Sequence, residues 1–116
     1  MRALLGLAAI LAVGAVVVHE NRNDQVTATQ LAAWMHDGRP GLRIIDLRSD
    51  SAYTAGHIPG AEHMSLSQLR HAEFRRNETV VLYTTDGKRV SGVGHVYWLH
   101  GGAGAWADRH PWRGGC

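Results

Sequence analysis

Three observations predict that the sequence forms one small α/β domain, with a mainly parallel sheet flanked by helices. Helix-like and strand-like segments alternate along the chain, as they do in α/β proteins. The segments at residues 79–83 and 95–99 are apolar on both faces, as strands covered by helices on either side should be. The chain has 116 residues, 45% hydrophobic and 19% charged, which is an ordinary composition for one globular domain.

Local signals place the individual elements. A helix is expected over residues 27–35, where Thr27 and Gln30 have the spacing of a capping box and Gly38 follows as a C-terminal cap. The other elements are expected in this order: a strand at 42–47, a short helix capped by Ser49, a tight loop at 57–66, a helical segment at 65–74, strands at 79–83 and 95–99, and one helical turn at 105–108.

The first 18 residues differ from the rest. One cation, Arg2, precedes an unbroken apolar run over residues 3–18. At about 1.5 Å per helical residue, this run is slightly shorter than a hydrocarbon core of roughly 30 Å. It is interpreted either as a cleaved signal peptide or as an uncleaved membrane anchor. Both interpretations predict an exported protein, periplasmic or membrane-anchored, with the domain outside the cytoplasm.

The remainder divides into a polar linker at 19–25, the domain at 26–108 and a tail at 109–116. The tail ends in Cys116, which is the single cysteine, so no disulfide can form within the chain. A terminal thiol of this kind is most often incidental; a mobile redox or dimerising thiol is the alternative.

Charge and histidine spacing exclude two classes of site. Without residues 1–18 the cations fall from 12 to 11 against 10 acids, so the pI of 9.1 does not indicate a nucleic-acid partner. Neither His57 and His63 nor His95 and His100 have the spacing of metal ligands on one helix face. No metal and no cofactor are therefore expected.

Three stretches together resemble the rhodanese-like domain family. "RIIDLRSDSAYTAGHIPGAEHMSLSQL" at 43–69 is similar to its Asp-x-Arg strand end and Gly-His-Ile-Pro-Gly-Ala loop. "VVLYTTDGKR" at 80–89 is similar to its central strand and active-site loop, Cys-x-x-Gly-x-Arg, and "GHVYWLHGGAGAW" at 94–106 to its closing strand and Gly-Gly turn. The resemblance implies a sulfurtransferase scaffold, in which a loop cysteine carries sulfur as a persulfide and loop amides hold an anionic donor.

One departure from the family lies at the nucleophile. Aligning Gly87 and Arg89 on the motif places Thr84 at the position of the cysteine. A threonine hydroxyl is neutral near pH 7 unless a base activates it, and His95 and His100 are available in principle as that base. The sequence therefore predicts no catalytic residue. The expected anion-binding loop consists of Thr84, Thr85, Asp86, Gly87, Lys88 and Arg89, with Asp46, Arg48 and His57 as supporting residues.

A second departure follows the loop. Family members have a helix of about three turns there, whereas only "VSGV" separates Arg89 from Gly94 in this chain. The helix after the loop is therefore expected to be shortened or missing. A different interpretation stays open, in which Asp86-Gly87 forms the turn of a β-hairpin that pairs Thr84 with Arg89 and leaves no anion cradle.

These features lead to three hypotheses. The first is a catalytically inactive rhodanese-like module of the cell envelope, which binds an unknown protein or a small oxyanion and contacts the membrane through residues 3–18 if these are uncleaved. The second is an active thiosulfate or persulfide sulfurtransferase. The third is a decayed family member with no selected activity.

Overall fold

The computed structural model describes residues 24–112 of the chain. The expectations for the apolar segment at 1–18, for most of the linker and for Cys116 lie outside these residues. Within residues 24–112, no helix has both the length and the apolar character needed to cross a membrane.

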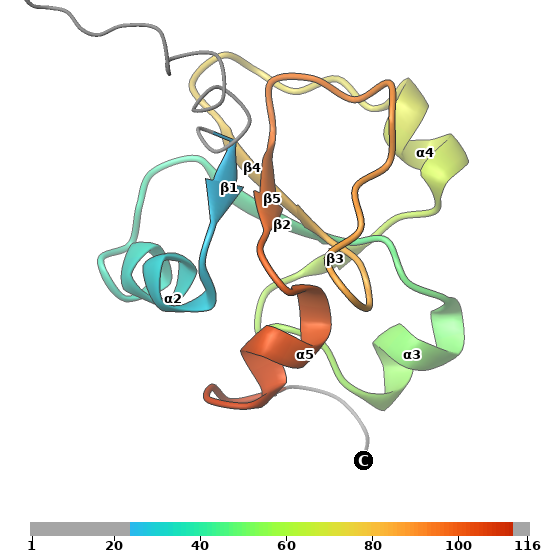
Figure 1. Cartoon of the computed structure of the whole chain (residues 1–116). Coiled ribbons are helices and arrows are strands. Elements are labelled where there is room, and N and C mark those ends of the chain that lie inside the picture. Colours follow the sequence, from blue (N-terminus) through green and yellow to red (C-terminus); the bar gives the residue numbers. More distant parts are fainter. Residues whose placement is uncertain (1–23, 113–116) are drawn as a thin grey trace, which may run out of the picture.

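The centre of the molecule is a five-stranded sheet with the order β1-β5-β4-β2-β3 (Figure 1). Every neighbouring pair of strands is parallel. The strands are β1 (Gln25–Val26), β2 (Leu42–Asp46), β3 (Glu62–His63), β4 (Thr79–Tyr83) and β5 (Tyr97–Leu99). The predicted α/β class with a mainly parallel sheet is confirmed.

Three of the four described helices begin with a side-chain cap, and two of these caps, Thr27 and Ser49, were predicted from the sequence. The helices are α2 (Ala28–His36), α3 (Asp50–Ala55), α4 (Leu66–His71) and α5 (Gly102–Ala107). The predicted capping box of α2 is confirmed: the Gln30 amide donates to Thr27 Oγ1 at 3.1 Å, and the Thr27 amide donates to Gln30 Oε1 at 2.9 Å. Ser49 caps α3 as expected.

Several boundaries differ from the prediction. The strand expected at 95–99 begins at Tyr97, and the helical turn expected at 105–108 is the helix Gly102–Ala107. Gln25, assigned to the linker, belongs to β1, and the loop expected at 57–66 contains β3. The helix expected at 65–74 ends at His71, because Ala72 has an extended backbone (φ −75°, ψ 145°). Phe74 thereby leaves the helix and packs against the buried residues of the sheet.

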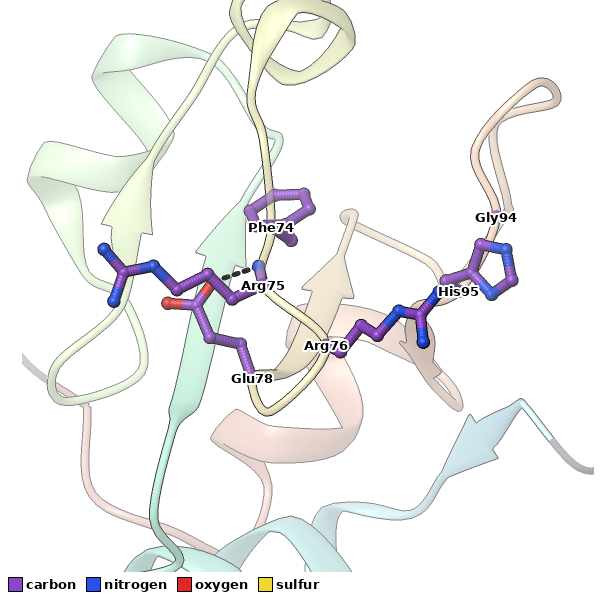
Figure 2. A pocket seen from close by; sticks show the side chains of 6 residues that line it. All are labelled: Phe74, Arg75, Arg76, Glu78, Gly94 and His95. Carbon is purple, nitrogen blue, oxygen red and sulfur yellow. Dashed lines mark hydrogen bonds between the residues drawn. The ribbon is translucent and has the colours of Figure 1, made fainter.

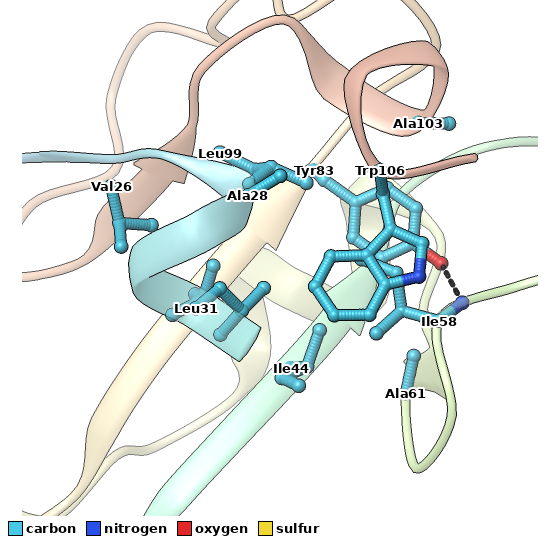
Figure 3. Packing of buried hydrophobic residues seen from close by; sticks show 11 residues of the cluster. Val26, Ala28, Leu31, Ile44, Ile58, Ala61, Tyr83, Leu99, Ala103 and Trp106 are labelled. Atoms are coloured by element: carbon cyan, nitrogen blue, oxygen red, sulfur yellow. Dashed lines mark hydrogen bonds between the residues drawn. The ribbon is translucent and has the colours of Figure 1, made fainter. Parts of the chain in front are cut away.

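The hydrophobic core has two parts, which match the alternation of side chains along the strands. On β4, Val81 and Tyr83 belong to one part, whereas Val80 and Leu82 belong to the other. This confirms that the strand is apolar on both faces. Figure 3 shows the larger part, whose buried residues are Val26, Ala28, Leu31, Ile44, Ile58, Ala61, Val81, Tyr83, Leu99, Ala103 and Trp106.

The connection from β4 to β5 contains no helix within the described chain: residues 84–96 form loops and turns. Its Val90 and Val93 pack against the smaller part of the core, on Leu82 and its neighbours. Irregular chain therefore covers part of this face of the sheet, beside Leu69 of α4. The expectation that the helix after the loop is shortened or missing is confirmed.

Candidate functional site

The predicted site residues lie where the strands of the sheet end. Leu42–Asp46 of β2 pair with Thr79–Tyr83 of β4 residue by residue, so Asp46 and Tyr83 end their strands at the same level. The next residues are also joined, since the Leu47 amide donates to the Tyr83 carbonyl at 3.0 Å. Ligands of parallel α/β sheets typically bind at this carboxyl edge, which makes it the first place to look for a site.

The loop after β4 uses its polar groups internally. Thr84 Oγ1 accepts a hydrogen bond from the Gly87 amide at 3.2 Å and donates one to the Lys88 carbonyl at 3.0 Å. The Lys88 amide donates to Asp86 Oδ1 at 3.1 Å. Two amides that could bind an external anion therefore already have acceptors supplied by the loop's own side chains.

The inner side of the loop packs against the Gly101-Gly102 turn that follows β5. A Cβ atom added to Gly87 would lie 2.8 Å from the Gly101 nitrogen, which is too close for a real contact. A Cβ atom on Gly102 would collide with the Thr84 carbonyl oxygen, which also accepts a hydrogen bond from the Ala103 amide at 2.9 Å. The glycines thus let two backbone segments touch, and no anion-sized space remains between them.

The hairpin interpretation of this loop is wrong. Among the described residues, β4 pairs in parallel with β2 and β5, and residues 84–90 form no strand that could return antiparallel to it. The Asp86 carboxylate accepts a hydrogen bond from the Lys88 amide, which forms an Asx turn, and Gly87 between them has a left-handed backbone (φ 89°). The segment is a loop closed by its own side chains.

Arg89, expected in the anion-binding loop, is bound elsewhere. Its Nη1 donates to Asp24 Oδ2 at 2.9 Å, and its Nη2 lies 2.8 Å from Asp24 Oδ1. Asp24 precedes β1, which is separated from β4 by β5. The guanidinium is therefore held beside the edge strand rather than above Thr84. Thr85 and Lys88 are exposed.

Asp46 and Arg48 form a buried ion pair. Arg48 donates to the Asp46 carboxylate through Nη2 at 2.7 Å and through Nε at 3.0 Å, and its backbone amide donates to Oδ1 at 2.8 Å. Arg48 Nη2 also reaches the Gly56 carbonyl at 2.6 Å. Burial lowers the pKa of Arg48, but the hydrogen bonds and charge of Asp46 outweigh it and raise the pKa overall. The pair joins the end of β2 to the loop after α3.

Tyr83 is a residue that the sequence reasoning missed. Its side chain is fully buried, and its hydroxyl accepts a hydrogen bond from the Ile58 amide at 3.1 Å (Figure 3). Burial, followed by the neighbouring Asp46, raises the pKa of Tyr83 far above its ordinary value, so the phenol stays neutral. A tyrosine at the last position of a buried apolar strand was the available signal. Its role is to fix the Gly-His-Ile-Pro-Gly-Ala loop to β4.

His57, expected as a supporting residue, is engaged in local contacts. His57 stacks on Tyr53 with ring centroids 3.8 Å apart, and its Nδ1 lies 2.8 Å from the Tyr53 carbonyl oxygen. Thr84 Oγ1 makes its hydrogen bonds with Gly87 and Lys88, so neither His95 nor His100 is placed to act as a general base for this hydroxyl. Within residues 24–112, no group of three or more histidine, cysteine, aspartate or glutamate side chains could hold a metal ion.

Hollow surface occurs instead beside the segments that precede β4 and β5. A pocket of about 530 Å³ is lined by Phe74, Arg75, Arg76, Glu78, Gly94 and His95 (Figure 2). A second pocket of about 350 Å³ shares Gly94 and His95 and extends to Asp24. Because Glu78 and Val96 directly precede strands, this is the amino edge of the sheet, opposite the loop that begins at Thr84.

Comparison with known proteins agrees with this architecture. Residues 27–109 match the family model of the rhodanese-like domain. This chain belongs to the rhodanese-like domain family, and it is therefore related to sulfurtransferases.

Individual relatives lie within the same family. The thiosulfate sulfurtransferase GlpE of Pseudomonas entomophila (strain L48) is 29% identical over 82 residues, which cover 61% of this chain and 75% of the relative. The crystal structure of the Alr3790 protein from Anabaena sp. superposes with a TM-score of 0.66 at 28% identity, covering 77% of this chain and 82% of that one. A thiosulfate sulfurtransferase from Pseudomonas aeruginosa is 31% identical with a TM-score of 0.61, covering 79% of this chain but 19% of its own.

Proposed function

We propose that this chain is a rhodanese-like module that does not transfer sulfur and that acts by binding a protein or a small oxyanion. The observation that carries the proposal is the state of Thr84. Its hydroxyl stands at the position of the family's nucleophile, and both of its hydrogen bonds go to the loop itself. The residue has a structural task in place of a chemical one.

The chemistry of the chain supports this proposal. Sulfur transfer requires a soft nucleophile that attacks the outer sulfur of thiosulfate, expels sulfite and holds the sulfur as a persulfide. A threonine oxygen has neither the polarisability nor the acidity for that step. The one sulfhydryl of the chain is Cys116, at its last position.

The electrostatics of the loop support it as well. An anionic sulfur donor would need free amides and nearby cations at the loop. Here the Gly87 and Lys88 amides are engaged, the carboxylate of Asp86 adds negative charge, and Arg89 pairs with Asp24. Each of these features lowers the affinity of this loop for thiosulfate.

The cell envelope is the proposed location. The apolar run at residues 3–18 motivates this part of the proposal, through either a cleaved signal or a retained anchor. Fractionation of the native host, with the intact mass of the purified chain, distinguishes the two. A chain recovered in the cytosol with residues 1–18 retained would contradict an envelope location.

An active sulfurtransferase is the second candidate, and the names of the two thiosulfate sulfurtransferases among the relatives favour it. The deciding assay follows thiocyanate formation from thiosulfate and cyanide with the full chain and with Cys116→Ser. We expect no turnover above the uncatalysed rate from either protein. Turnover that survives in Cys116→Ser would refute the proposal, whereas turnover lost with Cys116 would assign the chemistry to the tail.

The third hypothesis, a decayed domain, predicts poor folding. The well-packed core and the fully engaged Asp46–Arg48 pair argue instead for a cooperative fold. A thermal unfolding experiment discriminates the two: a single cooperative transition fits a maintained module, and a broad transition or none fits decay.

A further inference from the structure

The pocket at the amino edge of the sheet lies beside a rigid turn. Residues 75–78 form this turn, in which the Glu78 amide donates to the Arg75 carbonyl at 3.0 Å. The Arg75 amide donates in return to Glu78 Oε1 at 2.9 Å (Figure 2). Because both ends of the turn are fixed, Arg76 in its middle is presented from a defined backbone position.

The one acidic residue that lines the pocket is committed to other partners. Glu78 Oε1 accepts the Arg75 amide and also lies 3.6 Å from Nη1 of Arg43. In Figure 2 the side chains of Arg75 and Glu78 extend to the side away from His95. Glu78 is therefore held by the Arg75 amide and by Arg43, which it shares with Glu62, and among the described residues no ion pair joins it to Arg76.

Arg76 and His95 face the pocket from opposite walls. Figure 2 shows the Arg76 side chain running from the turn toward His95, which belongs to the segment before β5. In the part of the chain that the structure describes, the Arg76 guanidinium has no hydrogen-bond or ion-pair partner. Two donors that share a pocket without an acceptor between them leave room for an anion.

The backbone at His95 is unusual. It has a positive φ of 61°, alone among the non-glycine residues from 24 to 112. Histidine tolerates the left-handed region better than most residues, but the conformation is still uncommon. Strained positions of this kind concentrate at binding sites, and here the strain turns an imidazole toward a cationic pocket.

We infer that this pocket binds a phosphate group, held between the Arg76 guanidinium and the His95 imidazole. A planar guanidinium matches two phosphate oxygens at once, and the imidazole N–H supplies a further donor. A volume of about 530 Å³ fits a small phosphorylated molecule, and Phe74 supplies an apolar wall for its remaining part. This inference names a ligand for the binding module proposed above and therefore rests on that proposal.

Two sources could supply the phosphate group. One is a free phosphorylated molecule. The other is a phospholipid headgroup, because Asp24, where the described chain begins, lines the neighbouring pocket. The apolar run ends at Val18, six residues before Asp24. An extended segment of that length spans roughly 20 Å, so a retained anchor would hold the pocket near the membrane surface.

The test titrates the full chain, held in non-ionic detergent micelles, while NMR follows the backbone amide signals of residues 74–96, which include positions 76 and 95. One arm adds inorganic phosphate, and the other adds phosphatidylglycerol to the micelles. We expect Arg76→Gln to raise the apparent dissociation constant at least about tenfold and Arg70→Gln to change it less than about twofold. The two variants remove the same charge, but Arg70 is exposed and does not line the pocket.

Each outcome has a defined meaning. A loss of binding in Arg76→Gln alone supports the phosphate site in this pocket. The arm with the tighter binding shows whether the phosphate group comes from a free molecule or from a phospholipid. Equal losses in both variants, or signals that move at residues 84–89 instead, overturn the inference. If Arg76→Gln does not fold, His95→Asn replaces it, since asparagine also adopts the left-handed backbone. The sulfur-transfer assay is independent of this titration, so either proposal can fail alone.

Discussion

The hydroxyl oxygen of Thr84 lies 3.2 Å from the backbone nitrogen of Gly87 and accepts its hydrogen bond. Thr84, which the sequence motif aligns with the family's cysteine, thereby closes its own loop. The first prediction tests this bond.

Thr84→Val keeps the shape of the side chain but removes both of its hydrogen bonds. At about 1 kcal/mol for each bond, we expect the free energy of unfolding to fall by about 1–2 kcal/mol. The matched control is Thr85→Val, since Thr85 is exposed and makes no side-chain hydrogen bond in the described structure. Urea unfolding measures both variants, and equal stability of the two would contradict the structural role of Thr84.

Asp46→Asn removes the negative partner of Arg48 within the core. The Asp46 side chain is 0% exposed and that of Arg48 is 9% exposed, so the remaining guanidinium would be a buried charge without its counterion. We expect a loss of about 3–5 kcal/mol in the free energy of unfolding.

Asp50→Asn is the control for that change, because the Asp50 side chain is 95% exposed. Chemical denaturation should show little change for this variant. A small effect of Asp46→Asn, similar to that of Asp50→Asn, would mean that the buried pair contributes little to stability.

The sequence predicted the elements whose signals are local. The capping box of Thr27 and Gln30 lies within four residues, and β4 is a run of five apolar or β-branched residues bounded by polar ones. The edge strands β1 and β3 were missed because each has two residues and is defined by its neighbour in the sheet. No periodicity can be detected over two residues.

The candidate site was predictable in composition but not in connectivity. Thr84, Gly87 and Arg89 lie along the one loop that follows β4. The pairing of Arg89 with Asp24 spans 65 residues, and the contact of Gly87 with Gly101 joins the loops that follow the neighbouring strands β4 and β5. Such contacts depend on strand order and register, which local sequence does not specify.

Gly102→Ala tests the contact between the two loops. Gly102 has a φ of 65°, and an added Cβ atom would collide with the backbone of Thr84 and Gly87. Strain and overlap together should lower the free energy of unfolding by about 2–4 kcal/mol. Gly104→Ala, in the same helix and with nothing within 4 Å, should instead stabilise by about 0.5–1 kcal/mol. Thermal unfolding that ranks the two variants in the opposite order would contradict the packing.

The decrease of the free energy of unfolding at acidic pH should depend in part on Glu62. Arg43 donates to its carboxylate at 2.9 and 2.8 Å, and this hydrogen bonding lowers the pKa of Glu62 below its ordinary value of 4.5. The ionised carboxylate therefore stabilises the fold above that value, and the stabilisation is lost as the pH falls below it through the lowered pKa.

Glu62→Gln should flatten this dependence between about pH 6 and about pH 3, whereas Glu73→Gln, at an exposed site, should retain the wild-type slope. Urea unfolding across that range measures the slopes. If the unfolding free energies of the wild type and of Glu62→Gln fell equally steeply with decreasing pH, the Arg43–Glu62 contact would not form in solution.

The central claim is that the loop after β4 carries no transferable sulfur. Intact-mass spectrometry of the Cys116→Ser chain after exposure to thiosulfate tests it most directly, because that chain contains no thiol. We predict an unchanged mass. A gain equal to one sulfur atom, localised by fragmentation to residues 84–89, would contradict the account.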